Sequence, residues 1–175
     1  MVNNNSNFMY FKHNSTYIIK INGTIKYTIC NEFDKFINFI FGKEKIDNII
    51  IDLRGTNYLD STCLGLLAKI ANYLINKKDK KPTLISNNKD INRILNGVGF
   101  NKVFHIIKKY PKNIEELEEI SVNDKDTLSR DMGKMILDAH KSLFNLNEKN
   151  KETFKDVVSI FQKQLKNNKK KGKDN

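Results

Sequence analysis

The sequence predicts a small α/β domain, with a mixed sheet of four or five strands and four helices, followed by a C-terminal helical extension. Short segments rich in β-branched residues alternate with segments of helical spacing over residues 8–120, and this order favours parallel strands joined by right-handed crossovers. A turn separates the first two strand segments, so an antiparallel hairpin is expected and the sheet should be mixed. Beyond residue 121 the apolar residues keep helical spacing alone.

The first strands and the first helix follow from β propensity, turn residues and spacing. Phe8–Lys12 and Thr16–Ile21 have the β-branched and aromatic content of strands, and His13-Asn14-Ser15 between them is a turn signal. Asn22-Gly23 is expected to close the second strand. A helix that Gly42 ends is predicted from apolar residues three and four apart: Ile29, Phe33, Phe36, Ile37 and Ile40.

The central strand and the helix after it are the most informative part of the chain. Asn48–Leu53 reads as a buried strand, and a polar turn leads to Asp60-Ser61-Thr62, which opens a helix that reaches about Asn76. Its apolar face comprises Leu64, Leu67, Ala68, Ala71, Leu74 and Ile75. Ser61 is therefore expected in the first turn of a helix, beyond the carboxyl end of a strand, where open α/β sheets present functional groups. A phosphate on this hydroxyl would lie near the unpaired amides of the helix start.

The remaining elements of the domain are shorter. Thr83–Ser86 is expected to be a strand, and the next helix is capped by Asn87-Asn88 and stopped by Gly99. Val103–Ile107 is the last strand candidate, and Pro111 should begin a short acidic helix that carries Ile114, Leu117 and Ile120 on one side.

The chain is divided into a flexible N-terminus (1–7), the α/β domain (8–120), an amphipathic helical extension (121–166) and a basic disordered tail (167–175). The extension reads as two helices with a break at about residues 145–150. Two interpretations of it stay open. The helices bury their apolar stripes on the α/β domain or in a dimer, or they form a detachable arm that engages a partner.

Composition narrows the class of function. The net charge is +11, but residues 163–175 alone hold six lysines against one aspartate, and the chain has three arginines, so nucleic-acid binding is disfavoured. No run approaches the roughly 20 apolar residues that a membrane span needs. The N-terminus does not read as a secretory signal, and Cys30 and Cys63 are expected to be reduced, half-buried thiols. A cytoplasmic protein is therefore predicted.

No residue set for catalysis is found, and the protein is predicted not to be an enzyme. His13, His105 and His140 fall in a turn, a strand and a helix without ligand spacing, so no metal or other cofactor is expected. Ser61 has no histidine or lysine beside it in the sequence. The glycines that a hydrolase nucleophile elbow needs are replaced by Leu59 and Cys63.

Residues 48–75 resemble the STAS domain family, the fold of bacterial anti-sigma-factor antagonists and of the regulatory ends of sulfate transporters. The matching features are Asp52-Leu53 at the end of a strand, the block Tyr58-Leu59-Asp60-Ser61-Thr62, and Leu64-Gly65 in the helix. A second match is made by Ile94-Leu95, Gly97, Gly99-Phe100 and Val103-Phe104. Asp, Ser and Thr are favoured at any helix start. The surrounding pattern, over about residues 8–110, is what distinguishes this block from a plain cap.

The resemblance implies a phosphorylation switch. In antagonists of this family a partner that is both anti-sigma factor and serine kinase phosphorylates the serine after the aspartate, which is Ser61 here. The unphosphorylated form captures the anti-sigma factor, the phosphorylated form releases it, and a metal-dependent serine/threonine phosphatase resets the switch. The residues expected to bind the partner or shape the site are Lys26, Asn57, Asp60, Thr62, Cys63 and Gly65.

Two residues depart from the family pattern. Cys63 stands where glycine is frequent, which enlarges the surface beside the acceptor. Lys26 stands where many members have an aspartate, and its ammonium group is able to pair with a phosphate. The alternative function is a constitutive scaffold or an accessory subunit of a transport or signalling complex, in which Ser61 is only a helix cap.

Overall fold

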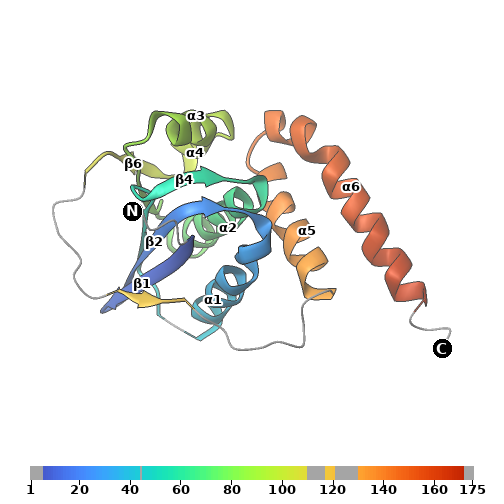
Figure 1. Ribbon diagram of the computed structural model, residues 1–175, viewed down its shortest axis with the longest axis horizontal. Coiled ribbons are helices and arrows are strands. Elements are labelled where there is room, and N and C mark those ends of the chain that lie inside the picture. Colours follow the sequence, from blue (N-terminus) through green and yellow to red (C-terminus); the bar gives the residue numbers. More distant parts are fainter. Residues whose placement is uncertain (1–5, 44, 110–116, 121–129, 172–175) are drawn as a thin grey trace.

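The sheet is mixed, as the sequence predicts, and helices cover one of its faces (Figure 1). In the computed structural model, residues 6–43, 45–109, 117–120 and 130–171 are described, and they contribute seven strands and six α-helices. The sheet order is β6-β5-β3-β2-β1-β7, with β4 paired to β2 off this path. The strands and their bounds are β1 (Asn7–His13), β2 (Thr16–Ile25), β3 (Asn48–Asp52), β4 (Thr56–Leu59), β5 (Thr83–Ile85), β6 (His105–Ile107) and β7 (Glu118–Glu119).

β2 is longer than expected, because Asn22-Gly23 does not end it. Its first part pairs in parallel with β3, and after a register shift between Gly23 and Thr24 its last residues pair with β4. Gly23 has a φ of +81°, a backbone conformation that glycine adopts without a steric penalty. The glycine therefore makes a bulge in the strand rather than a turn after it. β4, in a stretch predicted as a polar turn, owes its existence to this extended part of β2.

The helices share one hydrophobic core. η1 (Tyr27–Ile29), α1 (Cys30–Lys43), α2 (Ser61–Lys78), α3 (Lys89–Gly97) and α4 (Phe100–Val103) follow the sequence order between the strands. Because side chains alternate across a strand, Ile19 and Ile51 face the helices, whereas Ile18 and Ile50 belong to a separate, smaller cluster on the other face of the sheet. The principal core is formed by the helix-facing side of the sheet together with Phe33, Ile37, Leu67, Ile91, Leu95 and Phe100.

One prediction for the end of the domain is wrong, because a strand stands where a helix that carries Leu117 and Ile120 was expected. Residues 110–116, where the acidic helix was expected to begin, lie outside the described residues, but Glu118–Glu119 form β7 on the edge of β1. The amide of Ile120 donates to the carbonyl of Phe8. Pairing with the open edge of β1 satisfies backbone groups that a helix would leave facing water, and this tertiary contact overrides the helical spacing.

The C-terminal extension forms two helices that run beside the domain. α5 (Arg130–Phe144) packs between α2 and α6 (Glu148–Lys171), as Figure 1 shows. Met135, Ala139 and Leu143 of α5 are buried in the principal core, so this stripe is covered by the chain's own domain. α6 continues to Lys171, and residues 167–171 are therefore helical rather than a disordered tail. Lysine is a good helix former and is favourable near a helix C-terminus, which accounts for the added turn.

The turn between β3 and β4 is fixed by an ion pair between the buried carboxylate of Asp52 and the exposed guanidinium of Arg54. Asp52, at the end of β3, accepts hydrogen bonds from the backbone amide and from the guanidinium of Arg54, at 2.7–3.0 Å. Burial alone raises the pKa of Asp52, but the hydrogen bonds and charge of Arg54 outweigh it and hold the pKa below its ordinary value of 3.8. The ionised carboxylate is thus favoured in the folded protein, and it holds the chain that leads to β4.

We therefore expect an acid-dependent loss of stability that depends on Asp52. A depressed carboxyl pKa stabilises the fold above the unfolded-state pKa, and this contribution is lost as the pH falls through the lower, folded-state value. Between about pH 5 and pH 2 the wild type should lose more free energy of unfolding than Asp52→Asn, measured by urea denaturation at each pH. The control is Asp90→Asn, since the Asp90–Arg93 pair is 81% and 83% exposed. An identical pH dependence in wild type and Asp52→Asn would contradict this account.

Candidate functional site

Asp60 fixes the start of α2. It follows β4 directly, and its amide donates to the carbonyl of Ile25 at the end of β2. Its backbone is extended, and its side chain caps the helix: Oδ1 accepts from the amide of Cys63 at 3.0 Å. The other oxygen, Oδ2, accepts from the amide of Tyr27 at 2.5 Å. One carboxylate therefore ties the start of α2 to the turn that begins α1, and Ser61 is held at the carboxyl end of β4.

Ser61 is half-buried, and its hydroxyl contacts the C-terminal extension. Ser61 Oγ lies 3.0 Å from Nε2 of His140 in α5. The other ring nitrogen, Nδ1, lies 2.7 Å from the carbonyl oxygen of Ile136. A carbonyl only accepts hydrogen bonds, so this network assigns the proton to Nδ1. In the neutral ring Nε2 then accepts, and Ser61 donates its hydroxyl proton to it.

The imidazole of His140 is held by α6. The residue is 5% exposed, and its ring centroid lies 6.0 Å from that of Phe154 and 6.4 Å from that of Phe161. The Phe161 ring is nearly parallel to the imidazole, whereas the Phe154 ring meets it edge-on. Two aromatic rings and one carbonyl thus determine where Nε2 points, so the contact with Ser61 comes from a packed layer rather than from a mobile side chain.

Gly65, one turn beyond Ser61, lies where α2 and α5 approach each other closely. A Cβ built on Gly65 would overlap the backbone carbonyl of Ala139, the residue before His140. The absence of a side chain lets the two helix backbones approach closely at this point, and the hydrogen bond from Ser61 to His140 forms beside it. Gly65 is therefore placed at a helix crossing, a role that the sequence did not indicate.

The other predicted site residues are partly brought together. Asp60, Thr62 and Cys63 share the first turn of α2 with Ser61, but Thr62 and Cys63 are buried. Asn57 on β4 and Lys26 before η1 are exposed, and the backbone carbonyl of Lys26 accepts from the amide of Ile29. Thus only part of the predicted set reaches the surface.

Both cysteines are free and fully buried, not half-buried as predicted. A hydrogen bond to Cys30 and burial raise the pKa of the Cys63 thiol well above its ordinary value. Cys63 therefore packs beneath the start of α2 as a neutral thiol and does not enlarge the outer surface beside Ser61.

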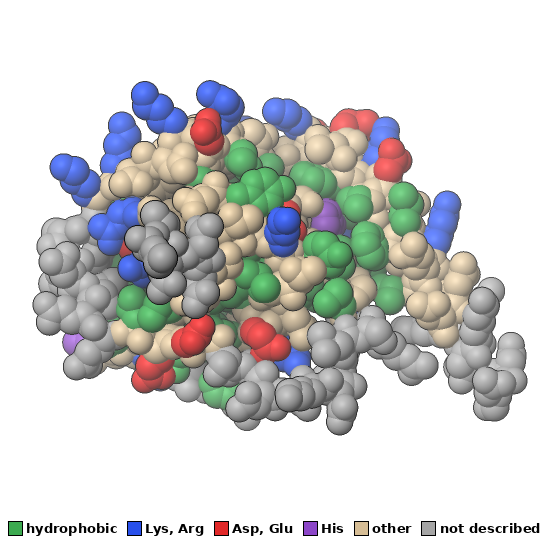
Figure 2. All heavy atoms as spheres, in the orientation of Figure 1, with side chains coloured by type: hydrophobic (Ala, Val, Ile, Leu, Met, Phe, Trp, Pro, Cys, Tyr) green, Lys and Arg blue, Asp and Glu red, His purple; other side chains and the backbone are tan. Residues whose placement is uncertain are grey.

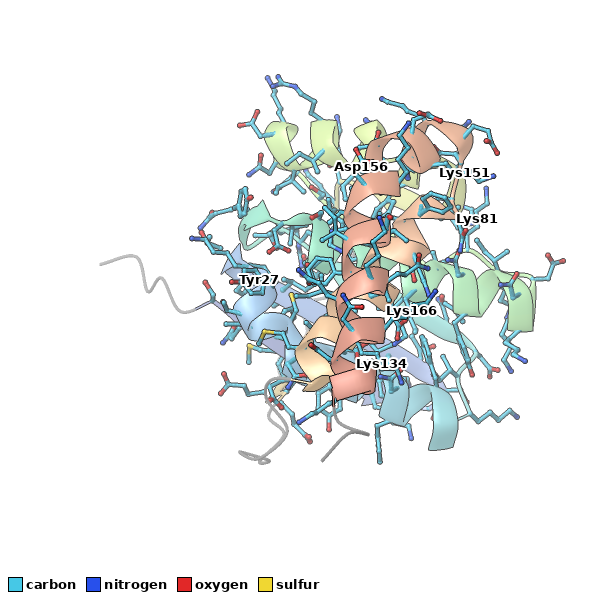
Figure 3. All side chains as sticks on the ribbon, turned by 90° about the vertical axis from the view of Figure 1, so that its right-hand side faces the viewer. Tyr27, Lys81, Lys134, Lys151, Asp156 and Lys166 are labelled. Atoms are coloured by element: carbon cyan, nitrogen blue, oxygen red, sulfur yellow. The ribbon has the colours of Figure 1, made fainter. Side chains whose placement is uncertain are left out.

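His140 and the two exposed tyrosines were missed from the sequence. The sequence predicts no role for His140, because it has no ligand spacing with His13 or His105, and the structure places it against Ser61, 79 residues away. Tyr27 and Tyr58 are 45% and 47% exposed. Figure 3 shows Tyr27 to one side of α6, outside the area that this helix covers. The sequence does not show whether an aromatic residue in a strand or a turn will be buried or exposed.

Residues 6–43, 45–109, 117–120 and 130–171 contain neither a cluster of metal-ligating side chains nor a membrane-spanning helix. There, no group of three or more His, Cys, Asp or Glu side chains is arranged to hold a metal ion. None of the helices in the described part of the chain has the length and apolar character needed to cross a bilayer.

Comparison with known proteins identifies the family. The model of the STAS domain matches residues 7–113, more than half of the chain, and the protein therefore belongs to the STAS domain family. α5 and α6 lie beyond the matched residues. No curated protein sequence matches the chain.

Solved structures show the same fold. An anti-sigma factor antagonist from Mycobacterium paratuberculosis superposes with a TM-score of 0.52 at 18% identity, over 63% of this chain and 90% of that one. The anti-sigma factor antagonist SpoIIAA in its unphosphorylated form gives a TM-score of 0.52 at 14% identity, over 58% of this chain and 89% of that one. At these identities the likeness concerns the fold.

The double role of Asp60 leads to a prediction. Asp60→Ala should lower the free energy of unfolding by about 1–2 kcal/mol, because it removes the cap of α2 and leaves the amide of Tyr27 without its acceptor. Asn88→Ala is the matched control, since Asn88 caps α3 through the amides of Asp90 and Ile91. Urea denaturation measures the stability, and amide hydrogen exchange followed by NMR measures the local effect. Faster exchange at Tyr27 is expected in Asp60→Ala and not in Asn88→Ala; unchanged exchange in both would contradict the bridging role.

Proposed function

We propose that this protein is a phosphorylation-switched binding regulator of the anti-sigma-factor antagonist type, acting in the cytoplasm. In its unphosphorylated state it binds an anti-sigma factor that is also a serine kinase, and phosphate on Ser61 releases that partner. Membership of the STAS family and the fold shared with two antagonists support the proposal. The observation that carries it is the position of Ser61, which begins α2 directly after the Asp60 cap and keeps part of its side chain accessible.

Charge and surface character explain how such a switch works. A phosphate on Ser61 adds about −1.5 to −2 charges at the rim of any partner that covers the start of α2. Exposed Tyr27 and Tyr58 belong to the two segments joined at Asp60, and exposed aromatic side chains are typical anchors of protein interfaces. An acidic partner surface would repel this phosphate. Against an apolar partner surface the phosphate would lose its hydration, which costs free energy. A loss of about 3 kcal/mol of binding free energy weakens the complex by more than ~100-fold.

The module acts by binding and not by catalysis of its own. Both the transfer of phosphate to Ser61 and its removal are assigned to partners, namely the kinase and a serine/threonine phosphatase. Exposed Lys26 lies next to Tyr27, whose amide binds Asp60, so its ammonium group is available to pair with a phosphate on this side of the site. Such a pairing would stabilise the phosphorylated form.

A second candidate is a constitutive STAS scaffold or accessory subunit of a transport or signalling complex. One observation favours it: the hydroxyl of Ser61 already has a partner within the chain, in His140. Under this alternative Ser61 is a structural residue, and binding partners do not respond to its charge.

Two Ser61 variants separate these functions. Ser61→Asp should weaken binding to the anti-sigma factor by about 100-fold, whereas Ser61→Ala should retain binding, because only the first adds charge. Ser15→Asp, in the turn between β1 and β2, is the control for added charge elsewhere. Titration calorimetry with the purified partner measures the affinities, and peptide mass spectrometry of protein from its own cells tests for phosphate on Ser61. Equal affinities of the two Ser61 variants would favour the scaffold.

A further inference from the structure

Two contacts place α5 over the Ser61 side of α2. Ser61 and Gly65 are one turn apart on α2, and Ala139 and His140 are adjacent in α5. The close approach at Gly65 and the hydrogen bond at Ser61 therefore form one continuous contact between the helices. Ala139 and His140, which make these two contacts with α2, both belong to the extension. The extension lies beyond the residues that the family model matches. The Ser61 side of α2 is therefore partly covered by the extension.

The hydrogen bond closes one side of the acceptor oxygen. Oγ and Nε2 are 3.0 Å apart, so no further group fits between them. Phosphorylation by a nucleoside triphosphate-dependent kinase forms the Oγ–P bond, breaks the bond from phosphorus to the leaving diphosphate oxygen, and passes the hydroxyl proton to the kinase's base. That proton is the one that Ser61 donates to His140, and a buried ring between Phe154 and Phe161 cannot turn aside without moving α6.

The connection between α5 and α6 is itself anchored on the domain. Asn150 is 2% exposed, and its amide donates to the carbonyls of Val98 and Leu143 at 3.0 Å. Asn147 donates to the same Val98 carbonyl at 3.3 Å. These bonds join the C-terminal end of α3 to the turn of the helix pair. The helix pair is thus held at two places, by the polar anchor at its turn and by the contact along α2 that includes the Ser61–His140 hydrogen bond.

The outer helix, α6, exposes more of its side chains over residues 148–168 than α5 does over residues 132–144. Within residues 148–168, Val158 is buried, whereas Ile160 is 53% exposed. Figure 3 shows α6 as the outermost layer, in front of α5, with Lys151, Asp156 and Lys166 on it. Figure 2 shows hydrophobic side chains gathered along the seam between the domain and the C-terminal helices.

We propose that the α5–α6 helix pair is an intramolecular cover of the Ser61 site. In the closed state α5 occupies the side of α2 that carries Ser61, and in the open state the pair has left α2. The kinase acts on the open state, and a partner that binds α2 competes with α5 for the same surface. The biological meaning of this cover rests on the function proposed above, whereas the closed state rests on the contacts alone.

The test uses a glycine substitution that the closed state cannot accommodate. In Gly65→Ala the added methyl group overlaps the carbonyl of Ala139, so α5 must move away from α2. In Gly42→Ala, also within a helix, the methyl group meets nothing within 4 Å, which makes it the matched control. Asn150→Ala is a second opening variant, because it removes the shorter of the two hydrogen bonds to the Val98 carbonyl, and the bond to Leu143, without touching α2.

Accessibility of position 61 is the readout. Ser61→Cys is introduced into the full-length wild type and into each variant, and labelling by a charged aromatic disulfide reagent is timed. Cys30 and Cys63 are fully buried, and protein without the introduced cysteine gives the background rate. We expect labelling to be about tenfold faster or more with Gly65→Ala or Asn150→Ala, and unchanged with Gly42→Ala. Equal rates in all four proteins, each with folded-state circular dichroism, would overturn the cover.

The readout keeps the two proposals separate, since it needs no kinase, phosphate or partner. Should Gly65→Ala fail to fold, Asn150→Ala alone decides between a faster rate, which supports the cover, and an unchanged rate, which overturns it. Faster labelling at position 61 in a protein that does not bind the anti-sigma factor would support the cover and contradict the proposed function. Unchanged labelling, together with weaker binding of Ser61→Asp to the anti-sigma factor, would contradict the cover and support the proposed function.

Discussion

The carboxylate of Asp60 is the interaction on which the site depends. Its two oxygens accept from the amides of Cys63 and Tyr27, so one side chain joins the first turn of α2 to the turn that precedes α1. One charged acceptor thus satisfies two backbone amides that start helical turns and would otherwise lack a partner within the chain. The position of Ser61 follows, because the next residue after such a cap must enter the helix with its side chain at the rim of the sheet.

The position of Asp60 depends in turn on the pairing of β4 with β2. β2 has to remain extended beyond the end of β3 for β4 to find a partner, and the bulge at Gly23 makes this possible. The ion pair of Asp52 with Arg54 then holds the turn between β3 and β4. The polar turn, the glycine bulge and the capping carboxylate are thus all needed to position the start of α2. Each is a local feature, but together they place a hydroxyl where a partner or a helix of the same chain reaches it.

The extension changes what this hydroxyl contacts. α5 supplies buried residues to the principal core, and at Gly65 the two helix backbones approach as closely as they do because no side chain stands between them. The contact of His140 with Ser61 is therefore a product of helix packing, with Phe154 and Phe161 of α6 holding the ring. The charged side chains of α6 remain outside, and its lysines continue the basic character of the C-terminus without forming part of the site.

The alternation of strands and helices, the start of α2 at Ser61 and the family could all be predicted from the residues, because these features depend on local propensity, capping and periodic burial. Two helices after the domain were also predictable, since an apolar stripe at helical spacing is visible in any single chain. The bulge at Gly23, the pairing of Glu118–Glu119 with β1, and the contact of His140 with Ser61 were not predictable in this way. Those features depend on which segments meet in space, and residues 79 positions apart carry no local signal of their contact.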